Sequence, residues 1–505
     1  MQRKQLTLVI VSLLVVVLSV SLAYFTTQII GKGKDVSVTS ANLQIVFTDS
    51  DGALTETDIE PGWSATKTFT IKNDTKTEYK YNIVIKDLLN TFVTNGYLQY
   101  KITSTNDGYN MTEFKDIPKS SAPKDTILAY SVVIPNGVTQ SYTIEFKYAN
   151  DENVDQSDDM GKKLSGTLFI TEGTEQPTLL SQILNDNPTR NTRDTYDAVF
   201  TNNTTGTLFT ATEKNVHNIA DTTVYYYAGN TTNNWVKFAG YYWRIIRTNA
   251  DGSIRLLYSG TEAEGTTGTN GMINTSTAFN SSYNSPKYVG YMYGENDDTL
   301  ANARTNTKNS TIKDKIDTWY AQNMTSYTKY LSTTAVYCND RTEKTSGTYT
   351  TGNTTFYYAP YARVYTNYAP TYDCTEASDA FSGSNTSAKL TYPIALMTAD
   401  EIMRAGGKVE TSLTSPYAWY YLNSTNGSIT GSNLWWLLSP YFWFGSGAFV
   451  FRVDGSSNPG YLSNNYVGIT DGVRPAISLK SCVKTSGGDG SANAPYTIEE
   501  STSGC

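Results

Sequence analysis

Few residues of this chain suit catalysis, and their spacing matches none of the common sequence motifs of hydrolytic enzymes. His217 is the single histidine among 505 residues, so a Ser-His-Asp or Cys-His arrangement would have to use it. It lies in EKNVHNIADTT, which holds no nucleophile motif, and we interpret it as a surface or hydrogen-bonded structural residue. The chain contains neither a GxSxG elbow nor a Walker loop. Carboxylate pairs for glycoside hydrolysis stay open, because their members meet only in the folded protein.

Acidic residues gather at three places that could suggest a metal or an acid pair. Glu295-Asn296-Asp297-Asp298 groups oxygen ligands of the kind that calcium prefers. Asp49-Ser50-Asp51-Gly52 begins like a calcium loop, but its glycine comes too early. We favour a solvated loop and a hairpin turn for these two, so no cofactor is predicted and calcium is the alternative. Asp400 and Glu401 are neighbours that diverge on a helix and fit a capping role.

The four cysteines, Cys338, Cys374, Cys482 and Cys505, all lie in the C-terminal half. Their spacing does not fit a zinc site, which uses close Cys or His pairs. Two disulfides are expected in an exported protein, and Cys338–Cys374 is the pair we favour. Free, buried thiols are the alternative.

The composition indicates a folded, exported protein that does not bind nucleic acid. Only 17% of the residues are charged, and the net charge is −8. Because phosphate contacts need clustered Lys and Arg, a nucleic-acid partner is excluded. Tyrosine is abundant, with 39 residues. Its flat apolar ring and hydroxyl suit both strands and binding surfaces.

The N-terminus predicts export. Arg3 and Lys4 precede an uncharged run from Leu6 to Ile30 that is long enough to span a bilayer as a helix. Ser21-Leu22-Ala23 also fits the small-x-small pattern of a cleaved signal. Residues 1–31 are therefore predicted to be a signal peptide or a membrane anchor helix, which would contact the membrane if uncleaved.

Residues 36–173 are predicted to form an all-β sandwich. Leu43, Ile45 and Phe47 alternate with polar residues, as do several later segments, and this period of two places one face toward a core. Turn signals such as Pro135-Asn136-Gly137 separate the segments. Short strands at this spacing favour a sandwich.

This N-terminal part resembles the camelysin/TasA type of bacterial surface and matrix proteins. The resemblance rests on SLAYFTT, ANLQIVFTD, IEPGWSATKTFTIKND and YKYNIVI, over about residues 1–172. It implies an Ig-like or jelly-roll sandwich behind a signal segment. The metalloprotease link of that family does not carry over, because this stretch has neither an HExxH motif nor a histidine.

Residues 174–190 are predicted to be a linker that contains a short amphipathic segment from Leu179 to Leu184. Beyond this linker, the sequence predicts a mixture of helices and strands. Residues 234–260 predict a hairpin around Asn249-Ala250-Asp251-Gly252. Ile312, Ile316, Trp319 and Tyr320 recur at helical spacing. Thr398 to Glu401 forms a capping box that opens a helix ending at Gly406-Gly407. We predict one α+β domain over residues 191–482, followed by a tail at residues 483–505.

The stretch WWLLSPYFWFGSGAFVFRVDGSSNPGYLSNNYVGITDGVRPAISL places aromatic residues among Ser, Gly and Asn. Rigid aromatic rings beside small polar residues are typical of binding loops, and clustered exposed rings need a partner. The predicted contact residues are Tyr441, Phe442, Phe444, Gly445, Ser446, Ser456, Ser457, Asn458, Tyr461, Asn464, Asn465, Tyr466, Ile469, Thr470 and Asp471. The predicted scaffold consists of Trp435, Trp436, Trp443, Arg474 and Pro475.

This last third resembles exported bacterial proteins with a C-type-lectin-like domain, related to the formylglycine-generating-enzyme fold and to the variable proteins of diversity-generating retroelements. The resemblance rests on FAGYYWRIIRTNADGSIRLLY, VYCNDR with a later YDC, YPIALMTADEIMRAGG, WWLLSP and GVRPAISL, over about residues 234–480. In the retroelement branch, mutagenesis directed at adenines rewrites the codons of the contact residues. The predicted contact residues are amino acids that this mutagenesis can produce, whereas the tryptophan at Trp443 is not. The formylglycine-generating branch uses groove cysteines, and Cys482 and Cys505 lie outside the matching stretch.

These observations predict a multidomain protein: a signal or transmembrane helix, an Ig-like or jelly-roll β-sandwich, and an α+β C-type-lectin-like domain. Its expected function is non-enzymatic binding of an extracellular protein or glycan at the cell surface. The alternatives are an enzyme on the same fold, either formylglycine-generating or glycan-active, and a structural surface or matrix protein.

Overall fold

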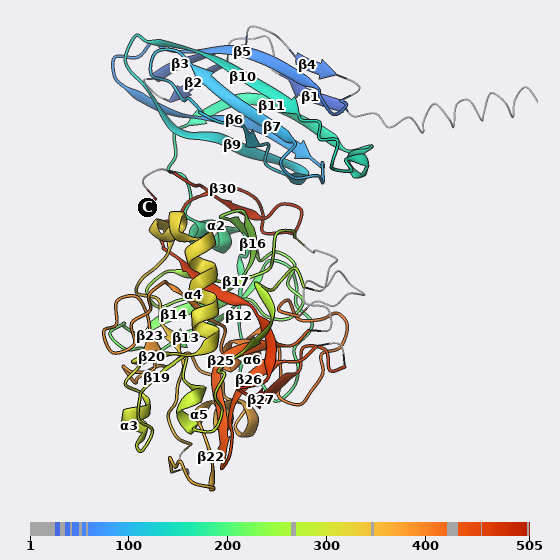
Figure 1. Cartoon of the computed structure of the whole chain (residues 1–505). Coiled ribbons are helices and arrows are strands. Elements are labelled where there is room, and N and C mark those ends of the chain that lie inside the picture. The colour runs from blue at the N-terminus through green and yellow to red at the C-terminus, as the bar shows by residue number, and fades with distance from the viewer. Residues whose placement is uncertain are drawn as a thin grey trace, which may run out of the picture. The chain divides into compact units, whose positions relative to one another are not determined.

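A computed structural model describes residues 26–30, 36–40, 43–49 and 53–56 by their backbone, and residues 59–263, 269–344, 348–421, 433–455, 457–501 and 504–505. The chain is mostly β, with several sheets and few helices (Figure 1). It divides into two compact units, residues 1–176 and 177–505, called here the first and second units.

The first unit holds two sheets with a shared core. Their strand orders are β4-β1-β11-β6-β9 and β2-β3-β5-β10-β7-β8. The bounds are β1 Thr26–Ile30, β2 Val36–Ser40, β3 Leu43–Asp49, β4 Ala53–Glu56, β5 Ser64–Asn73, β6 Tyr79–Asn90, β7 Leu98–Ser104, β8 Lys115–Asp116, β9 Ser120–Ile134, β10 Thr139–Tyr148 and β11 Lys163–Glu172, with a short 3-10 turn at Ser157–Asp159.

Buried and exposed residues alternate along these strands with a period of two, which explains why the two sheets pack face to face. Along β10, Tyr142, Ile144 and Phe146 are buried while the residues between them are partly exposed. Ile85 of β6 and Leu168 of β11, from the other sheet, belong to the same buried cluster. The apolar faces of the two sheets therefore cover each other.

The described end of the predicted N-terminal helix is a strand. Residues 1–25 lie outside the described part of the chain, and Thr26–Ile30 forms β1, which pairs with β11 and β4. Thr26 and Thr27 are β-branched and the segment finds two strand partners, which favours β structure over a helical continuation. Within the described residues, no helix is both long and apolar enough to cross a membrane.

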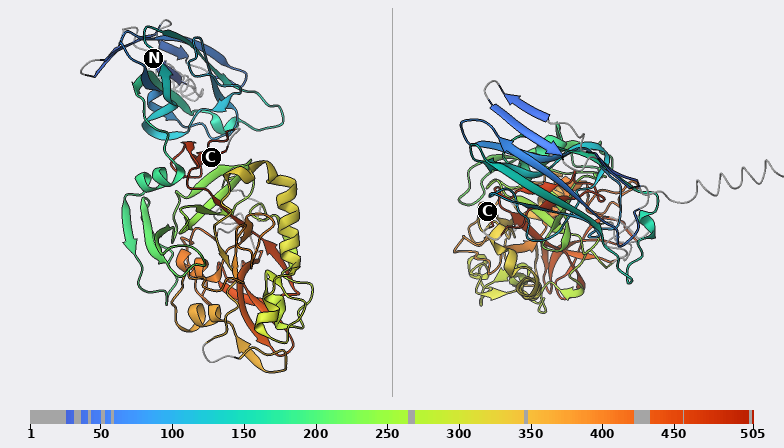
Figure 2. Two further views of the ribbon diagram at one scale, coloured as in Figure 1. Left: turned by 90° about the vertical axis from the view of Figure 1, so that its left-hand side faces the viewer. Right: turned by 90° about the horizontal axis from the view of Figure 1, so that it is seen from above.

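The second unit is built on two larger sheets and five helices among its described residues. Its helices are α2 Leu179–Asp186, α3 Leu300–Ala303, α4 Thr311–Asn323, α5 Ala359–Tyr361 and α6 Ala399–Ala405, with 3-10 turns at Pro286–Val289 and Thr325–Tyr330 and a π-helical turn at Ala362–Thr366. Figure 2 shows α4 running along one side of this unit. As predicted, Ile312, Ile316 and Tyr320 form the buried face of α4.

The strands of the second unit make a ten-stranded sheet, a six-stranded sheet and two short pairs. The bounds are β12 Thr189–Thr192, β13 Thr207–Glu213, β14 Thr222–Tyr226, β15 Trp235–Phe238, β16 Tyr241–Thr248, β17 Ile254–Tyr258, β18 Asn274–Ala278, β19 Met292–Tyr293, β20 Lys308–Asn309, β21 Tyr337–Cys338, β22 Thr355–Tyr357, β23 Ala380–Phe381, β24 Ile394–Leu396, β25 Trp435–Phe444, β26 Ala448–Val453, β27 Leu462–Tyr466, β28 Thr470–Val473, β29 Pro475–Leu479, β30 Thr485–Gly487 and β31 Tyr496–Ile498. The predicted hairpin at 249–252 joins β16 to β17.

Two predicted boundaries need correction. The linker at 174–190 contains α2, whose Leu179 and Ile183 are buried in the core of the second unit. The tail at 483–505 supplies β30 and β31 to the ten-stranded sheet, and β31 pairs in parallel with β15. Both segments carry apolar residues, such as Tyr496, whose burial adds favourable free energy to the fold.

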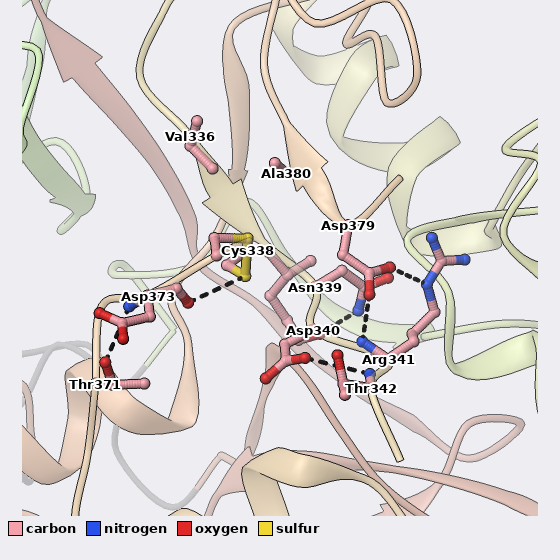
Figure 3. The surroundings of a disulfide bond; sticks show 12 residues. Val336, Cys338, Asn339, Asp340, Arg341, Thr342, Thr371, Asp373, Asp379 and Ala380 are labelled. Carbon is pink, nitrogen blue, oxygen red and sulfur yellow. Dashed lines mark hydrogen bonds and ion pairs between the residues drawn. A yellow bond between two sulfur atoms is a disulfide. The ribbon is translucent and has the colours of Figure 1, made fainter. Parts of the chain in front are cut away.

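Two disulfides close loops in the second unit. Cys338 and Cys374 form the expected pair, with an S–S distance of 2.06 Å, and Figure 3 shows Asp340 and Asp373 beside it. Cys482 and Cys505 form the second pair. Both are consistent with an extracellular protein.

Candidate ligand-binding face

The strands β22, β25, β26 and β27 are paired side by side (Figure 1). Four aromatic rings lie in a line across one face of these strands. The strand register places Tyr357 opposite Phe442, Phe442 opposite Phe449, and Phe449 opposite Tyr466. Successive ring centroids are 5.5, 4.4 and 3.9 Å apart. Directly opposed aromatic pairs of this kind stabilise a sheet as well as exposing ring surface.

Further rings extend this line at both ends. Tyr361 of α5 lies 4.2 Å from Tyr357, and Tyr365 stacks on Tyr361 at 4.9 Å. At the other end Tyr283 lies 6.1 Å from Tyr466. Phe444 lies 5.8 Å from Phe442. The term aromatic row is used below for Tyr283, Tyr357, Tyr361, Tyr365, Phe442, Phe444, Phe449 and Tyr466.

The end of β25 shows how the sequence sorts its aromatic residues. From Tyr441 to Phe444 the side chains alternate between the core and the surface, with Tyr441 and Trp443 buried, Phe442 half-buried, and Phe444 55% exposed. Period-two alternation therefore divides one aromatic run into a structural half and a surface half. An exposed phenylalanine costs free energy in water unless another surface covers it.

Two predicted contact residues are buried, which corrects the prediction. Tyr441 is only 6% exposed and packs on Phe451 and Tyr361, and Asp471 is held by Arg452 at 3.0 Å. Among the others, Phe444, Ser446, Ser457, Asn458, Ile469 and Thr470 are exposed, and Phe442, Gly445, Tyr461, Asn464, Asn465 and Tyr466 are half-buried. Ser456 lies outside the described residues.

Five members of the aromatic row were not among the predicted contacts. Phe449 lies between two groups of predicted contact residues, and its place in β26 opposite Phe442 follows from the hairpin between these strands. Tyr283, Tyr357, Tyr361 and Tyr365 are distant in sequence, and no local pattern links them to β25. Their recruitment depends on long-range pairing such as that of β22 with β25.

The predicted scaffold residues are all buried. The indole of Trp436 donates to the carbonyl of Thr277, and that of Trp443 donates to the carbonyl of Gly352, both at 2.8 Å. Arg474 donates to the carbonyls of Tyr420 and Tyr258 and lies over the ring of Trp435. Pro475 opens β29. These contacts suit residues that hold the sheet beneath the aromatic row.

Polar groups flank the row near the helical end. The hydroxyl of Tyr365 donates to the exposed carboxylate of Glu410 at 3.1 Å, and this hydrogen bond raises the pKa of Tyr365. The ammonium of Lys344 lies over the rings of Tyr357 and Tyr361. The row thus offers ring faces with one carboxylate and one cation beside them, and little net charge.

A separate cavity in the second unit is lined by charged residues that form ion pairs with one another. It encloses about 20 Å³, which is room for a water molecule. Glu401 accepts from Arg247 at 2.8 Å and Arg255 at 2.7 Å, and Asp400 accepts from Arg363. Burial alone would raise the pKa of Glu401, but the two guanidinium groups lower it to about 2. A carboxylate held ionised in this way does not serve as a general acid.

The acidic residues of the described loop at 295–298 each have a protein partner. Glu295 pairs with Lys308 at 2.7 Å, Asp298 accepts from Asn302, and Asp297 accepts from the hydroxyl of Ser285. Of the other acidic loop, only Asp49 is described, as the end of β3. Among the described residues, no group of three or more His, Cys, Asp or Glu is placed to hold a metal ion.

In the described part of the chain, the single histidine contacts a side-chain amide and a backbone carbonyl. The ring of His217 is hydrogen-bonded to the side chain of Asn218, and the backbone N–H of His217 donates to the backbone carbonyl of Cys374. These contacts fit the structural role expected for it.

Comparison with known proteins adds little. No protein-family profile matches the chain, and no curated protein matches it. Among solved structures, a family 35 carbohydrate-binding module from an environmental isolate is similar, with 10% identity, a TM-score of 0.15, and coverage of 31% of this chain and 95% of that one. At that score the likeness carries no weight in assigning a fold or a ligand.

Proposed function

We propose that this protein binds an extracellular ligand without chemical conversion, and that the aromatic row is its binding face. The observation that carries the proposal is the register of four opposed rings, Tyr357, Phe442, Phe449 and Tyr466, with exposed Phe444 beside them. Flat, rigid rings present contact area at little cost in conformational entropy.

The shape and charge of the row favour a linear, neutral glycan as the ligand. The four opposed rings lie on neighbouring strands ~4.8 Å apart, so together they form a strip about 14 Å long and one ring wide. A typical protein interface instead needs ~800 Å² on each partner. The C–H face of a sugar stacks on an aromatic ring, and its hydroxyls can bond groups such as Glu410. A proline-rich peptide also docks on aromatic tracks, and we treat it as a competing outcome of the test.

The wider assignment follows from the sequence. We propose that the second unit, residues 177–505, forms a C-type-lectin-like domain, carried at the cell surface behind a sandwich of the camelysin/TasA type. Retroelement diversification of the contact codons belongs to this proposal. A near-copy of the codons for 435–475 beside a reverse-transcriptase gene, differing at adenines, would support it, and its absence from related strains with an identical stretch would oppose it.

Phe444→Ala is expected to weaken glycan binding about five- to tenfold while changing the unfolding free energy by less than ~0.5 kcal/mol, because the ring is largely solvent-exposed. The probes are cellohexaose, chitohexaose and xylohexaose, with decaproline alongside, titrated by calorimetry into the full chain.

Met160→Ala is the matched control, because Met160 is 59% exposed but lies in the first unit. It should bind every probe as the wild type does. If no hexasaccharide binds, or if only decaproline does, the glycan assignment is wrong. Equal binding by Phe444→Ala and wild type would remove Phe444 from the face.

A further inference from the structure

The rings of Tyr361 and Tyr365 sit on a helical segment that is too short to be stable by itself. It consists of α5, Ala359–Tyr361, continued by the π-helical turn Ala362–Thr366. The N–H of Asn367 donates to the carbonyl of Ala362, five residues back, at 2.9 Å. Isolated helices of this length are unstable in water, and π turns are rare and often occur at functional sites. Tertiary contacts must therefore hold the two rings in place.

Arg363, midway between the two tyrosines, supplies the strongest of these contacts. Its Nε and Nη2 donate to the two carboxylate oxygens of Asp400 at 2.9 and 3.0 Å. Its Nη1 donates to Asp340 at 2.5 Å. The fork thus fixes both the direction and the rotation of the guanidinium, which a point charge would not do.

Both carboxylates are themselves anchored to rigid parts of the second unit. Asp400 lies in the first turn of α6 and also accepts from the backbone N–H of Thr371 at 3.0 Å. Asp340 follows the disulfide-bonded Cys338 by two residues and accepts from the N–H of Thr342 (Figure 3). Arg363 therefore connects the tyrosines to the start of a helix and to a disulfide.

The segment after Cys338 also contacts the helical turn through its backbone. The N–H of Ala359 donates to the carbonyl of Thr342 at 2.7 Å, and that of Lys344 donates to the carbonyl of Tyr357 at 2.9 Å. The same segment thus fixes the helix at its start through the backbone and at Arg363 through Asp340.

We propose that Arg363 is a positioning residue of the binding face: it holds Tyr361 and Tyr365 in line with the sheet rings by clamping their helical turn to Asp340 and Asp400. The part of this inference that concerns ligand affinity rests on the proposed function, whereas the part that concerns ring position does not.

Nitration by tetranitromethane, mapped by mass spectrometry on the full chain, tests ring position without a ligand. In Arg363→Ala, nitration of Tyr361 and Tyr365 should rise severalfold over wild type, while half-buried Tyr225 of β14 stays unchanged as an internal reference. Arg363→Lys keeps the charge without the fork and should give an intermediate rise. Reduction of Cys338–Cys374 should raise nitration of the same two tyrosines.

Arg452→Ala is the matched control, because Arg452 is partly buried like Arg363 and also pairs with two carboxylates, those of Asp454 and Asp471, which lie outside the helical turn and outside residues 340–344. Wild-type nitration at Tyr361 and Tyr365 in folded Arg363→Ala would overturn the inference. If Arg363→Ala does not fold, the test rests on Arg363→Lys, and wild-type nitration of Tyr361 and Tyr365 in that variant would overturn the inference. Increased nitration together with an unchanged hexasaccharide affinity would support the clamp and contradict a role of these two rings in binding.

Discussion

Replacing Glu401 with alanine is expected to lower the unfolding free energy of the second unit by about 3 to 5 kcal/mol, because it leaves buried guanidinium charges without their shared carboxylate. Arg247 also pairs with Glu213 at 3.1 Å, but in the described part of the chain Arg255 pairs with no carboxylate except Glu401. Glu401 also accepts from the backbone N–H of Thr398 at 3.0 Å, so α6 loses half of its capping box.

Urea unfolding at neutral pH measures this loss. Glu295→Ala is the matched control, because Glu295 forms an exposed ion pair with Lys308, and exposed pairs are worth less than ~1 kcal/mol. A Glu401→Ala protein as stable as the control would show that the arginines find other compensation, and the structural role given to the charged cavity would be wrong.

The same carboxylate makes the stability of the second unit depend on pH. Its pKa falls from an ordinary 4.5 to about 2 in the folded protein. A depressed pKa contributes stability that is present above the unfolded value and is lost as the pH falls toward the folded value. This contribution is about 3 kcal/mol by linkage. Glu401→Gln should therefore lose less stability than wild type between pH 4.5 and pH 2.

Phe442→Ala is expected to weaken hexasaccharide binding by about thirtyfold or more, which corresponds to the ~2 kcal/mol of a central hot-spot residue. Phe442 stacks on Phe449 at 4.4 Å and also contacts Tyr357 and Phe444. Its removal separates the three tyrosines on one side of the row from Phe449 and the rings beyond it, and takes away the ring that Phe444 contacts. Calorimetric titration of the hexasaccharide that wild type binds gives the measurement.

Phe442→Tyr is the control for this change, because it keeps the ring and its stacking partners. It should bind within about threefold of wild type, since an added hydroxyl at a half-buried surface costs little. If Phe442→Tyr and Phe442→Ala lose affinity equally, stacking is not the source of binding. If neither loses affinity, the ligand binds elsewhere.

Local features of the fold could be predicted because their signals are local. The capping box from Thr398 to Glu401 needs only four consecutive residues, and α4 follows from apolar spacing along one turn after another. The hairpin between β16 and β17 likewise lies within a single segment. In contrast, Thr26–Ile30 pairs with β11, far along the chain, and its apolar run alone suggested a continuing helix.

The candidate face was predictable only in part, for a related reason. Phe442, Phe444 and Tyr466 stand out as aromatic residues among small polar ones, but Tyr441 has the same neighbours and is buried by the alternation of β25. Which ring of an aromatic run faces solvent depends on the register. Tyr361 joins the row through a helix that no periodic pattern marks.

Hydroxyl-radical footprinting tests the central claim most directly. The full chain is oxidised with and without the hexasaccharide that it binds, and side-chain oxidation is quantified by mass spectrometry. We expect protection of Tyr357, Phe442, Phe444 and Tyr466, with unchanged oxidation of Met160 in the first unit. Protection confined to other residues, with the rings of the aromatic row oxidised as fast as in the free protein, would contradict the assignment of this face.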